Sequence, residues 1–327
     1  MHILILGAAG MVGRQLVERL TRDGRLGNRD ISKLTLQDVV PPAKPATSIP
    51  AEIVTCDVAD QAAIAKLVAG RPDVIFHLAA IVSGEAEADF DKGYRINLDG
   101  TRYLIDAVYA IGGSYHPRIV FTSSIAVFGA PFPEKIGDEF LSAPLTSYGT
   151  QKAIGELWIS DYTRKGLFDG VSIRLPTICV RPGMPNKAAS GFFSNIIREP
   201  LAGKEAVLPV SEDVMHWHAS PRSAVGFLIH AGTMDTGAMG PRRALSMPGL
   251  AATVGEQIAA LERVAGKNVT ARIKRVPDQT IMGIVGGWPR NFSTDRALKL
   301  GFTTAEKTFD DIIRIHIEDE LGGKFVA

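Results

Sequence analysis

The chain has 327 residues, of which 46% are hydrophobic and 22% charged, a globular composition that excludes collagen, coiled coil and extended disorder. Its 36 basic and 35 acidic residues give a net charge of +1, so no excess charge favours nucleic acid or an anionic membrane as a partner. We therefore expect a small-molecule ligand, no nucleic acid and no membrane, in a chain long enough for about two domains.

Short apolar runs alternate with segments of helical period from the first residues onward. The pattern predicts strands at 3–6, 33–37, 52–55, 74–78 and 118–122, and helices at 10–21, 61–69, 97–111 and 147–165. Continuous apolar strands separated by helices are typical of a parallel sheet covered on both faces. The predicted fold class is therefore α/β, a Rossmann-type doubly wound parallel sheet with its ligand at the carboxyl ends of the strands.

The regular alternation ends near residue 175, where prolines begin to interrupt the chain. We expect a Rossmann domain over 1–175, to which 219–249 returns. We expect a smaller, irregular lobe that binds the substrate over 176–218 and 250–327.

The two cysteines, Cys56 and Cys179, are too few for a disulfide framework and lie in no metal-binding motif. The first residues lack the basic start of a signal peptide, and no apolar run reaches the roughly 18 residues that a membrane span needs. These features predict a cytoplasmic protein.

Three glycines, Gly7, Gly10 and Gly13, form a G-x-x-G-x-x-G motif after the first predicted strand. The spacing alone is weak, but its place before a helix lets a pyrophosphate approach the helix N-terminus, where Met11 and Val12 lie. The alternative is a tight turn without a ligand.

Acidic residues end the next two predicted strands. Asp38 follows the second strand, where a carboxylate can accept both ribose hydroxyls and repel a 2′-phosphate, which favours NAD over NADP. Asp57, followed by Val58, ends the third strand and would lie beside the adenine amino group. The alternative for Asp57 is that it only caps the next helix.

Tyr148 and Lys152 lie one helical turn apart, so a phenol and an ammonium share one helix face. A surface pair is the alternative for such a spacing. Ser124, about 25 residues upstream, ends the fifth strand in a hydroxyl that can hold a substrate oxygen at the cofactor crevice.

Together with His77–Ala80, Asn97–Thr101 and Ser123–Ser124, these motifs resemble the extended short-chain dehydrogenase/reductase family over roughly the first 180 residues. The resemblance implies that residues 1–175 bind NAD and that Ser124, Tyr148, Lys152 and Asn97 form the catalytic set. It also implies a set of NAD contacts: Gly7, Gly10, Met11, Val12, Gly13, Asp38, Asp57, Val58, Leu78, Ala79, Ala80, Asn97, Tyr148, Lys152, Pro176 and Thr177.

A phenol with an ordinary pKa near 10 needs a shift of about three units, or about 4 kcal/mol, to act as a base near pH 7. Lys152 and the oxidised nicotinamide are expected to supply the positive charge. Ser124 would orient the substrate hydroxyl, Tyr148 would take its proton, and a hydride would pass to the nicotinamide.

The substrate is predicted from the second half of the chain. Nucleotide-sugar members of the family carry an Arg before the strand that Asp213–Trp217 resembles, whereas this chain has Glu212, which would repel a diphosphate. Residues 181–193 and 126–133 resemble sugar-acid dehydrogenases of the family. This resemblance implies oxidation of the 2-hydroxyl of a short sugar acid, such as D-erythronate, to the 2-oxo acid.

The candidate anchors for the substrate carboxylate are Asn186, Lys187 and Arg222, and Ser83 is the candidate for a hydroxyl contact. Each has the alternative of an ordinary solvated loop residue. Two alternatives to the dehydrogenase stay open, namely a sugar-nucleotide epimerase or dehydratase and a non-catalytic NAD-binding regulatory protein.

His216 and His218 alternate along a strand, but no ligand motif accompanies them, so we expect no metal. We interpret them instead as strand-end histidines that line the pocket or pack near it. Trp158 and Tyr162 lie at helical spacing and indicate either core positions or a helix face that forms a dimer. We expect a homodimer or a larger homo-oligomer.

Overall fold

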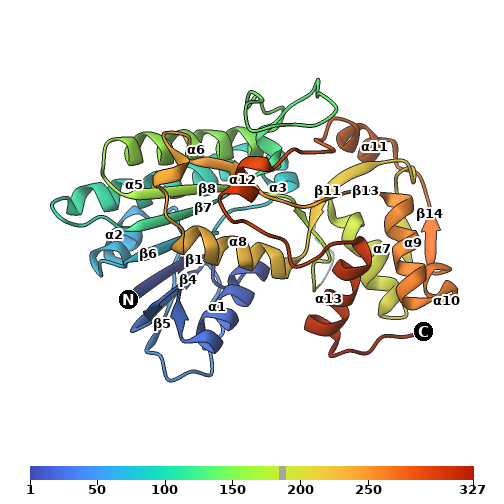
Figure 1. The fold of residues 1–327 in the computed structure, drawn as a ribbon, viewed down its shortest axis with the longest axis horizontal. Helices are drawn as coiled ribbons and strands as arrows, with labels where there is room; N and C mark the ends of the chain where they lie inside the picture. Colours follow the sequence, from blue (N-terminus) through green and yellow to red (C-terminus); the bar gives the residue numbers. More distant parts are fainter. Residues whose placement is uncertain (184–188) are drawn as a thin grey trace.

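The computed structural model describes residues 1–183 and 189–327. Its central feature is a seven-stranded parallel sheet with the order β12-β8-β7-β6-β1-β4-β5 (Figure 1). The strands are β1 (His2–Leu6), β4 (Lys33–Asp38), β5 (Ala51–Thr55), β6 (Val74–His77), β7 (Arg118–Ser124), β8 (Asp169–Leu175) and β12 (Ala244–Ser246). The predicted α/β fold of Rossmann type is confirmed, and each of the five predicted strands is present.

Helices cover both faces of the sheet, as the continuous apolar strands predict. On one face, α1 (Met11–Asp23) packs against α8 (Pro221–Thr233), over a core that includes Ile3, Ile5 and Phe76. The other face carries α2 (Gln61–Ala69), α5 (Gly100–Ile111) and α6 (Ser147–Arg164). The strand order reverses between β1 and β6, and such a switch point leaves a crevice for a ligand at the carboxyl ends of the strands.

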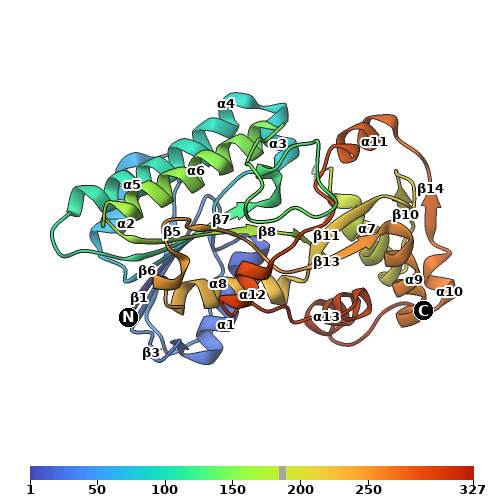
Figure 2. The same cartoon turned by 45° about the horizontal axis from the view of Figure 1, so that its top comes forward.

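A second lobe lies beyond the carboxyl ends of the strands (Figure 2). Its sheets are β13-β11-β9, from β9 (Thr177–Ile178), β11 (Met215–Ala219) and β13 (Leu250–Thr253), and β10-β14, from β10 (Ala206–Leu208) and β14 (Ile273–Arg275). Its helices are α7 (Gly191–Leu201), α9 (Val254–Ala265), α10 (Lys267–Thr270), α11 (Gln279–Gly286) and α13 (Phe309–Leu321). These elements enclose a core of their own, which includes Phe193, Leu261 and Ile312.

We propose two domains with the boundaries expected from the sequence, and with one addition. The segment 219–249 supplies α8 and β12 to the first domain. Ala297, in α12 (Asp295–Lys299), and Phe302 also pack into the core of the main sheet. The segment 295–302 would therefore be a second return to the Rossmann domain.

The remaining elements are short and connect the larger ones. They are the hairpin of β2 (Arg25–Leu26) and β3 (Arg29–Asp30), the helices α3 (Ser83–Ala88) and α4 (Phe90–Gly93), a π-helical turn (Tyr94–Asp99), and 3-10 turns at Ile125–Val127 and Gly237–Met239. The predicted helix 97–111 thus begins within the π-helical turn and continues as α5. In the two described stretches of the chain, no helix combines the length and the apolarity that crossing a bilayer requires.

Candidate active site

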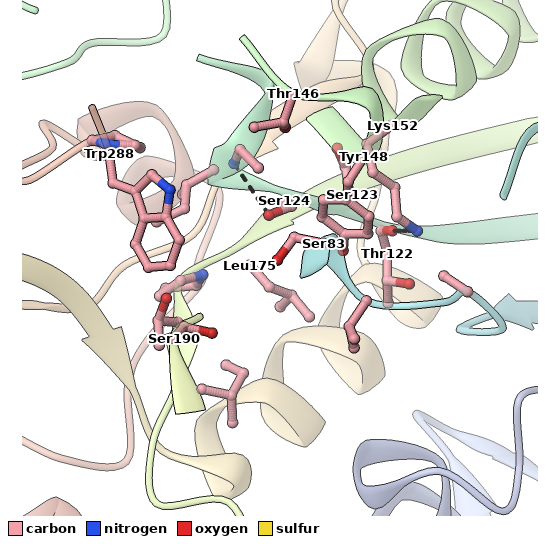
Figure 3. A pocket seen from close by; sticks show the side chains of 18 of the residues that line it. Ser83, Thr122, Ser123, Ser124, Thr146, Tyr148, Lys152, Leu175, Ser190 and Trp288 are labelled. Carbon is pink, nitrogen blue, oxygen red and sulfur yellow. Dashed lines mark hydrogen bonds between the residues drawn. The ribbon is translucent and has the colours of Figure 1, made fainter. Parts of the chain in front are cut away.

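A pocket lies at the carboxyl ends of the central strands, with walls from both lobes (Figure 3). Many of the residues predicted for cofactor or substrate line it, namely Met11, Val12, Leu78, Ala80, Ser83, Ser124, Tyr148, Lys152, Pro176 and Thr177. The structure therefore brings together residues that are up to 166 positions apart in the sequence, from Met11 to Thr177.

The close approach of α6 to the end of β7 places Tyr148 beside Ser124. Thr146 caps α6, where its side chain accepts a hydrogen bond from the Gly149 amide at 3.1 Å. A Cβ at Gly149 would lie 2.1 Å from the Ala126 carbonyl oxygen, so only glycine permits this contact. The serine hydroxyl and the phenol therefore meet in one wall of the pocket (Figure 3).

Lys152 is almost completely buried, with 2% of its surface exposed. Its Nζ donates a hydrogen bond to the Thr122 carbonyl oxygen at 2.8 Å and lies 5.7 Å from the centroid of the Tyr148 ring. Burial lowers the pKa of Lys152 to about 7, although the nearby Glu156 carboxylate opposes this change. Within the described residues this is the only hydrogen bond of the ammonium, so two N–H groups remain for hydroxyls of a ligand.

Burial also acts on the phenol. It raises the pKa of Tyr148, and the positive charge of Arg181 and a hydrogen bond with Ser124 partly offset this effect. The phenol is therefore protonated in the free protein, and its action as a base depends on added positive charge. That charge was expected from Lys152 and the oxidised nicotinamide, and Arg181 is an additional source.

A buried ion pair fixes α6 against β7 and β8. The Glu156 carboxylate accepts hydrogen bonds from Arg174 Nε at 2.8 Å, from Arg174 Nη2 at 2.7 Å and from Ser123 Oγ at 2.5 Å. Glu156 lies one turn after Lys152 on α6, and Ser123 precedes Ser124. The Glu156–Arg174 pair therefore links α6, which carries Tyr148 and Lys152, to the sheet strand β7, which carries Ser124, and to β8.

The low pKa of Lys152 leads to a prediction about stability. The unfolded chain holds this proton to about pH 10.4, whereas the folded chain releases it near pH 7. The folded state therefore carries the full cost of the buried charge below pH 7, and the cost disappears as the pH rises toward 10. At about 1.4 kcal/mol per pKa unit, the Lys152→Met variant without cofactor should be more stable than the natural protein by a few kcal/mol at pH 6.

Urea unfolding of both proteins at about pH 6 and about pH 10 checks this prediction. The difference in free energy of unfolding should shrink at the higher pH. An equal difference in the free energy of unfolding at the two pH values would show that burial of the charged Lys152 does not destabilise the folded state.

Asn97 lies beneath the pocket in the π-helical turn and is buried. Its Oδ1 accepts from the Ile81 amide at 2.8 Å, and its Nδ2 donates to Gln151 Oε1 at 2.8 Å. Because Gln151 precedes Lys152, Asn97 joins the chain after β6 to the helix that carries the candidate catalytic residues. It is not among the described residues that line the pocket, so these hydrogen bonds favour a positioning role over a contact with substrate.

The glycine motif forms an open helix terminus, which fits a dinucleotide phosphate. Gly7 has φ +91°, and a Cβ there would lie 2.6 Å from the Ala79 amide nitrogen. Gly10 is the N-cap of α1 and gives no side-chain hydrogen bond, and the first turn holds no acidic residue. The first amides of α1 are therefore available to an anion.

Asp38 ends β4 beside this motif. Its carboxylate accepts from the Ala9 amide at 2.9 Å and from the Val39 amide at 2.7 Å, which holds it next to the glycine loop. The residues that the structure describes here fit NAD, with Asp38 as the candidate for the ribose hydroxyls.

Asp57 accepts from the Ala59 amide at 2.9 Å and from Arg95 Nη1 at 2.7 Å. The residue that caps α2 is Asp60, whose side chain accepts from the Ala63 amide. Asp57 is therefore not the N-cap of that helix, and its contact with adenine stays a prediction, as does the contact of Val58.

Not all of the predicted substrate residues reach the pocket. Asn186 and Lys187 lie outside the described residues. Arg222 is exposed, forms ion pairs with Asp319 at 2.6 Å and Glu318 at 3.0 Å, and does not line the pocket. The expectation that Arg222 could anchor the carboxylate is not supported by this placement, because α13 supplies its partners.

Glu212 does not line the pocket either, and it pairs with Arg275 at 2.5 Å. The charge that was expected to repel a diphosphate is therefore directed to a neighbouring strand of the lobe. Glu212 therefore gives no reason to exclude a nucleotide sugar.

Arg181 is a second basic residue that lines the pocket, besides Lys152, and it was not among the predicted site residues. Its Nε donates to the Ile178 carbonyl at 3.1 Å and its Nη2 to Ser190 Oγ at 3.1 Å. Its backbone is held by Ser194 Oγ and by the guanidinium of Arg198. Among residues 1–183 and 189–327, Nη1 of this guanidinium has no acceptor, so it is a candidate donor to a ligand.

His216 also lines the pocket, where a hydrogen bond and ring packing hold it. Its Nε2 shares a hydrogen bond of 2.7 Å with Thr177 Oγ1, and its ring stacks on Phe193 at 5.1 Å. Burial lowers its pKa to about 4, so the ring is neutral at pH 7. Among residues 1–183 and 189–327, no group of three or more His, Cys, Asp or Glu side chains is arranged to hold a metal ion.

Comparison with known proteins agrees with this site. Residues 3–218 match the model of the NAD dependent epimerase/dehydratase family. The chain belongs to this family. Its cofactor is accordingly NAD, and the motifs from Gly7 to Lys152 that predicted it lie within the matched region.

Two relatives cover nearly the whole chain. A D-erythronate dehydrogenase of Cupriavidus necator is 44% identical over 98% of both chains. A D-erythronate dehydrogenase of Haemophilus influenzae is 39% identical over 98% of this chain and 100% of its own.

A solved structure from Agrobacterium tumefaciens, described as a nucleoside-diphosphate-sugar epimerase, is 63% identical. It covers 99% of this chain and 95% of its own, with a TM-score of 0.96. The names of these similar proteins therefore differ in the substrate that they suggest.

Proposed function

We propose that the protein is an NAD-dependent dehydrogenase that oxidises the 2-hydroxyl of a short sugar acid, such as D-erythronate, to the 2-oxo acid. The observation that carries this proposal is the charge of the pocket. Among its described lining residues, the charged side chains are Lys152 and Arg181, both cationic, and none is acidic. Such a pocket favours an anionic substrate. The two relatives named D-erythronate dehydrogenase support the same substrate class.

Each side chain has a distinct task in this reaction. The guanidinium of Arg181 binds the substrate carboxylate, because a guanidinium can recognise a carboxylate through paired hydrogen bonds. The adjacent 2-hydroxyl then meets Ser124 Oγ and the phenol of Tyr148. Ser124 orients the hydroxyl, and Tyr148 accepts its proton as a general base. Lys152 contributes positive charge behind the phenol and hydrogen bonds to ribose hydroxyls.

The cofactor supplies the remaining chemistry, because bound NAD accepts a hydride from carbon 2. The chain's contribution is geometric. Ile178 and Ser190 hold Arg181, and the packing of α6 holds Tyr148 beside Ser124. Carbon 2 of the substrate is therefore placed between Arg181 on one side and Ser124 and Tyr148 on the other. Holding a reactant in one orientation in this way is a major source of rate enhancement.

A sugar-nucleotide epimerase is the second candidate, because the similar Agrobacterium tumefaciens structure is described as one. The same serine, tyrosine and lysine serve either reaction, so the choice depends on the rest of the pocket. A free carboxylate is the simplest partner for Arg181, but a diphosphate is also anionic. The two candidates differ in whether NADH accumulates, since an epimerase returns its hydride to the substrate.

The test is a comparison of three substrates with NAD, followed by the absorbance of NADH. D-Erythronate should give sustained NADH formation, and erythritol, which lacks the carboxylate, should give little or none. A UDP-sugar should give neither NADH nor an epimer. Equal oxidation of erythritol, or epimerisation of a UDP-sugar without NADH, contradicts the proposal.

We also propose that two copies of the chain associate through α5 and α6. Tyr109 and Leu157 are 60% and 69% exposed on these helices, and the Tyr109 ring lies 6.4 Å from the ring of Tyr162. A shallow hollow beside them is lined by Arg102, Ile105, Asp106, Trp158 and Tyr162. The two helices lie side by side on the outside of the molecule (Figure 2).

A second copy is the occupant that fits this face, because a two-fold axis pairs one patch with itself. The expected result is a dimeric or larger mass by light scattering, and a monomeric mass for Leu157→Arg. A natural protein that is monomeric at all concentrations would contradict the proposal.

We propose the cytoplasm as the site of action. Cys56 and Cys179 are both free, and Cys179 is buried, which fits a compartment that keeps thiols reduced. Cell fractionation with an antibody to the protein tests this location. Recovery with the membrane or the external medium would contradict it.

A further inference from the structure

We propose that Trp288 sets the maximum length of the substrate, by forming the wall of the pocket that faces the catalytic side chains. The inference rests on the proposed oxidation of a sugar acid and adds the residue that selects short acids. Figure 3 shows the indole across the pocket from Tyr148 and Lys152, with Ser124 and Ser83 between them.

The wall comes from the second lobe, whereas the catalytic side chains come from the first. Gly287, Trp288 and Pro289 follow α11 and line the pocket. The Trp288 amide donates to the Val285 carbonyl oxygen at 3.0 Å, which closes the end of the helix. A substrate that reacts at Tyr148 and extends toward the second lobe therefore contacts the segment 287–289 with the end that is remote from Tyr148.

Packing behind the indole makes the wall rigid. The Trp288 ring lies 5.4 Å from the ring of His216, which itself stacks on Phe193 with an angle of 3° between the planes. A hydrogen bond of 2.7 Å between Thr177 Oγ1 and His216 Nε2 holds that imidazole in place. Trp288 also packs against the hydrophobic core of the lobe. The indole thus packs against the ring of His216, which is itself stacked on Phe193.

The position of the substrate gives this wall its effect. With the carboxylate at Arg181 and the 2-hydroxyl at Ser124 and Tyr148, both ends of the reacting fragment are fixed. The rest of the carbon chain occupies the space up to the indole. Each additional carbon must displace a ring that is held from behind, and one methylene commonly changes kcat/KM by about 10–200-fold in a tight pocket.

The experiment measures kcat/KM for D-erythronate and for six-carbon aldonates in four proteins. These are the natural protein, Trp288→Ala, Trp288→Phe and the control Ile284→Ala. Ile284 is an apolar residue of α11 that is 46% exposed and does not line the pocket. The control therefore changes the same segment without changing the wall.

The natural protein should prefer the four-carbon acid by about 100-fold or more, as expected for two additional carbons. Trp288→Ala should reduce this preference by at least about 10-fold, because kcat/KM for six-carbon acids rises. The preference of Trp288→Phe should lie between those of the natural protein and Trp288→Ala. Ile284→Ala should keep the natural preference. Binding of NAD, followed by fluorescence, shows that each variant is folded.

Three outcomes would overturn the inference. One is an equal loss on both acids in Trp288→Ala and Trp288→Phe, because a merely structural role gives no change in the ratio. Another is a natural protein that oxidises six-carbon acids as well as D-erythronate, which leaves the dehydrogenase proposal intact. A natural protein that binds NAD but oxidises no acid contradicts the proposed function itself, and the length limit with it.

Discussion

Replacing Tyr148 with phenylalanine should lower kcat by about 10²–10⁴-fold, the range expected for loss of a general base, while NAD binding changes little. The variant removes one oxygen and keeps the ring, so the contact of Lys152 with the ring and the packing of α6 are preserved.

Tyr115→Phe is the matched control for this prediction. The Tyr115 hydroxyl donates to the Pro72 carbonyl oxygen at 2.9 Å, just before the amino end of β6 and away from the pocket. Loss of this hydrogen bond should lower the free energy of unfolding by about 1 kcal/mol and leave kcat unchanged. A Tyr148→Phe enzyme with most of its turnover would remove the tyrosine from the mechanism.

Arg181→Met should lower kcat/KM for D-erythronate by about 10–150-fold, which corresponds to the 1.5–3 kcal/mol of hydrogen bonds to a charged group. The change removes the guanidinium that faces the pocket and keeps an apolar stem of similar length. Arg181→Lys should lose less, because it keeps the charge but not the paired geometry. Titration with NAD should give nearly the natural affinity for both variants.

The same substitution should also change the pH profile. The positive charge of Arg181 lowers the pKa of Tyr148, so its removal disfavours the phenolate and shifts the ascending limb of the kcat profile, on which the phenolate forms, to higher pH. Arg222→Ala is the control, because Arg222 is an arginine paired with Asp319 outside the pocket. If Arg222→Ala lowers kcat/KM for D-erythronate more than Arg181→Met does, the assignment of Arg181 as the anchor is wrong.

The parts of the site that the sequence predicts are those with local signals. Tyr148 and Lys152 share one helix face by their spacing, and Ser124 ends a strand whose direction is known once the sheet is parallel. The glycine motif likewise follows from its place between a strand and a helix. In each case the relevant geometry is set within one element or one turn.

Arg181 and Trp288 could not be found in this way, because they reach the pocket through packing within the second lobe. Arg181 follows the short strand β9, and its orientation depends on Ser190, Ser194 and Arg198. Arg222 shows the opposite case. It follows β11 as a plausible anchor, but α13 brings Asp319, 97 positions away, to pair with it. Long-range partners of this kind leave no periodic trace in the sequence.

The central claim, oxidation at carbon 2 of a short sugar acid, is tested most directly with D-erythronate carrying deuterium at carbon 2. The protein is incubated with this acid and NAD, and the reduced cofactor is analysed by mass spectrometry and NMR. We predict that the nicotinamide ring of each product molecule gains the deuterium and that 2-oxo acid forms in equal amount. Unlabelled NADH formed from the labelled acid, or no NADH at all, would contradict the account.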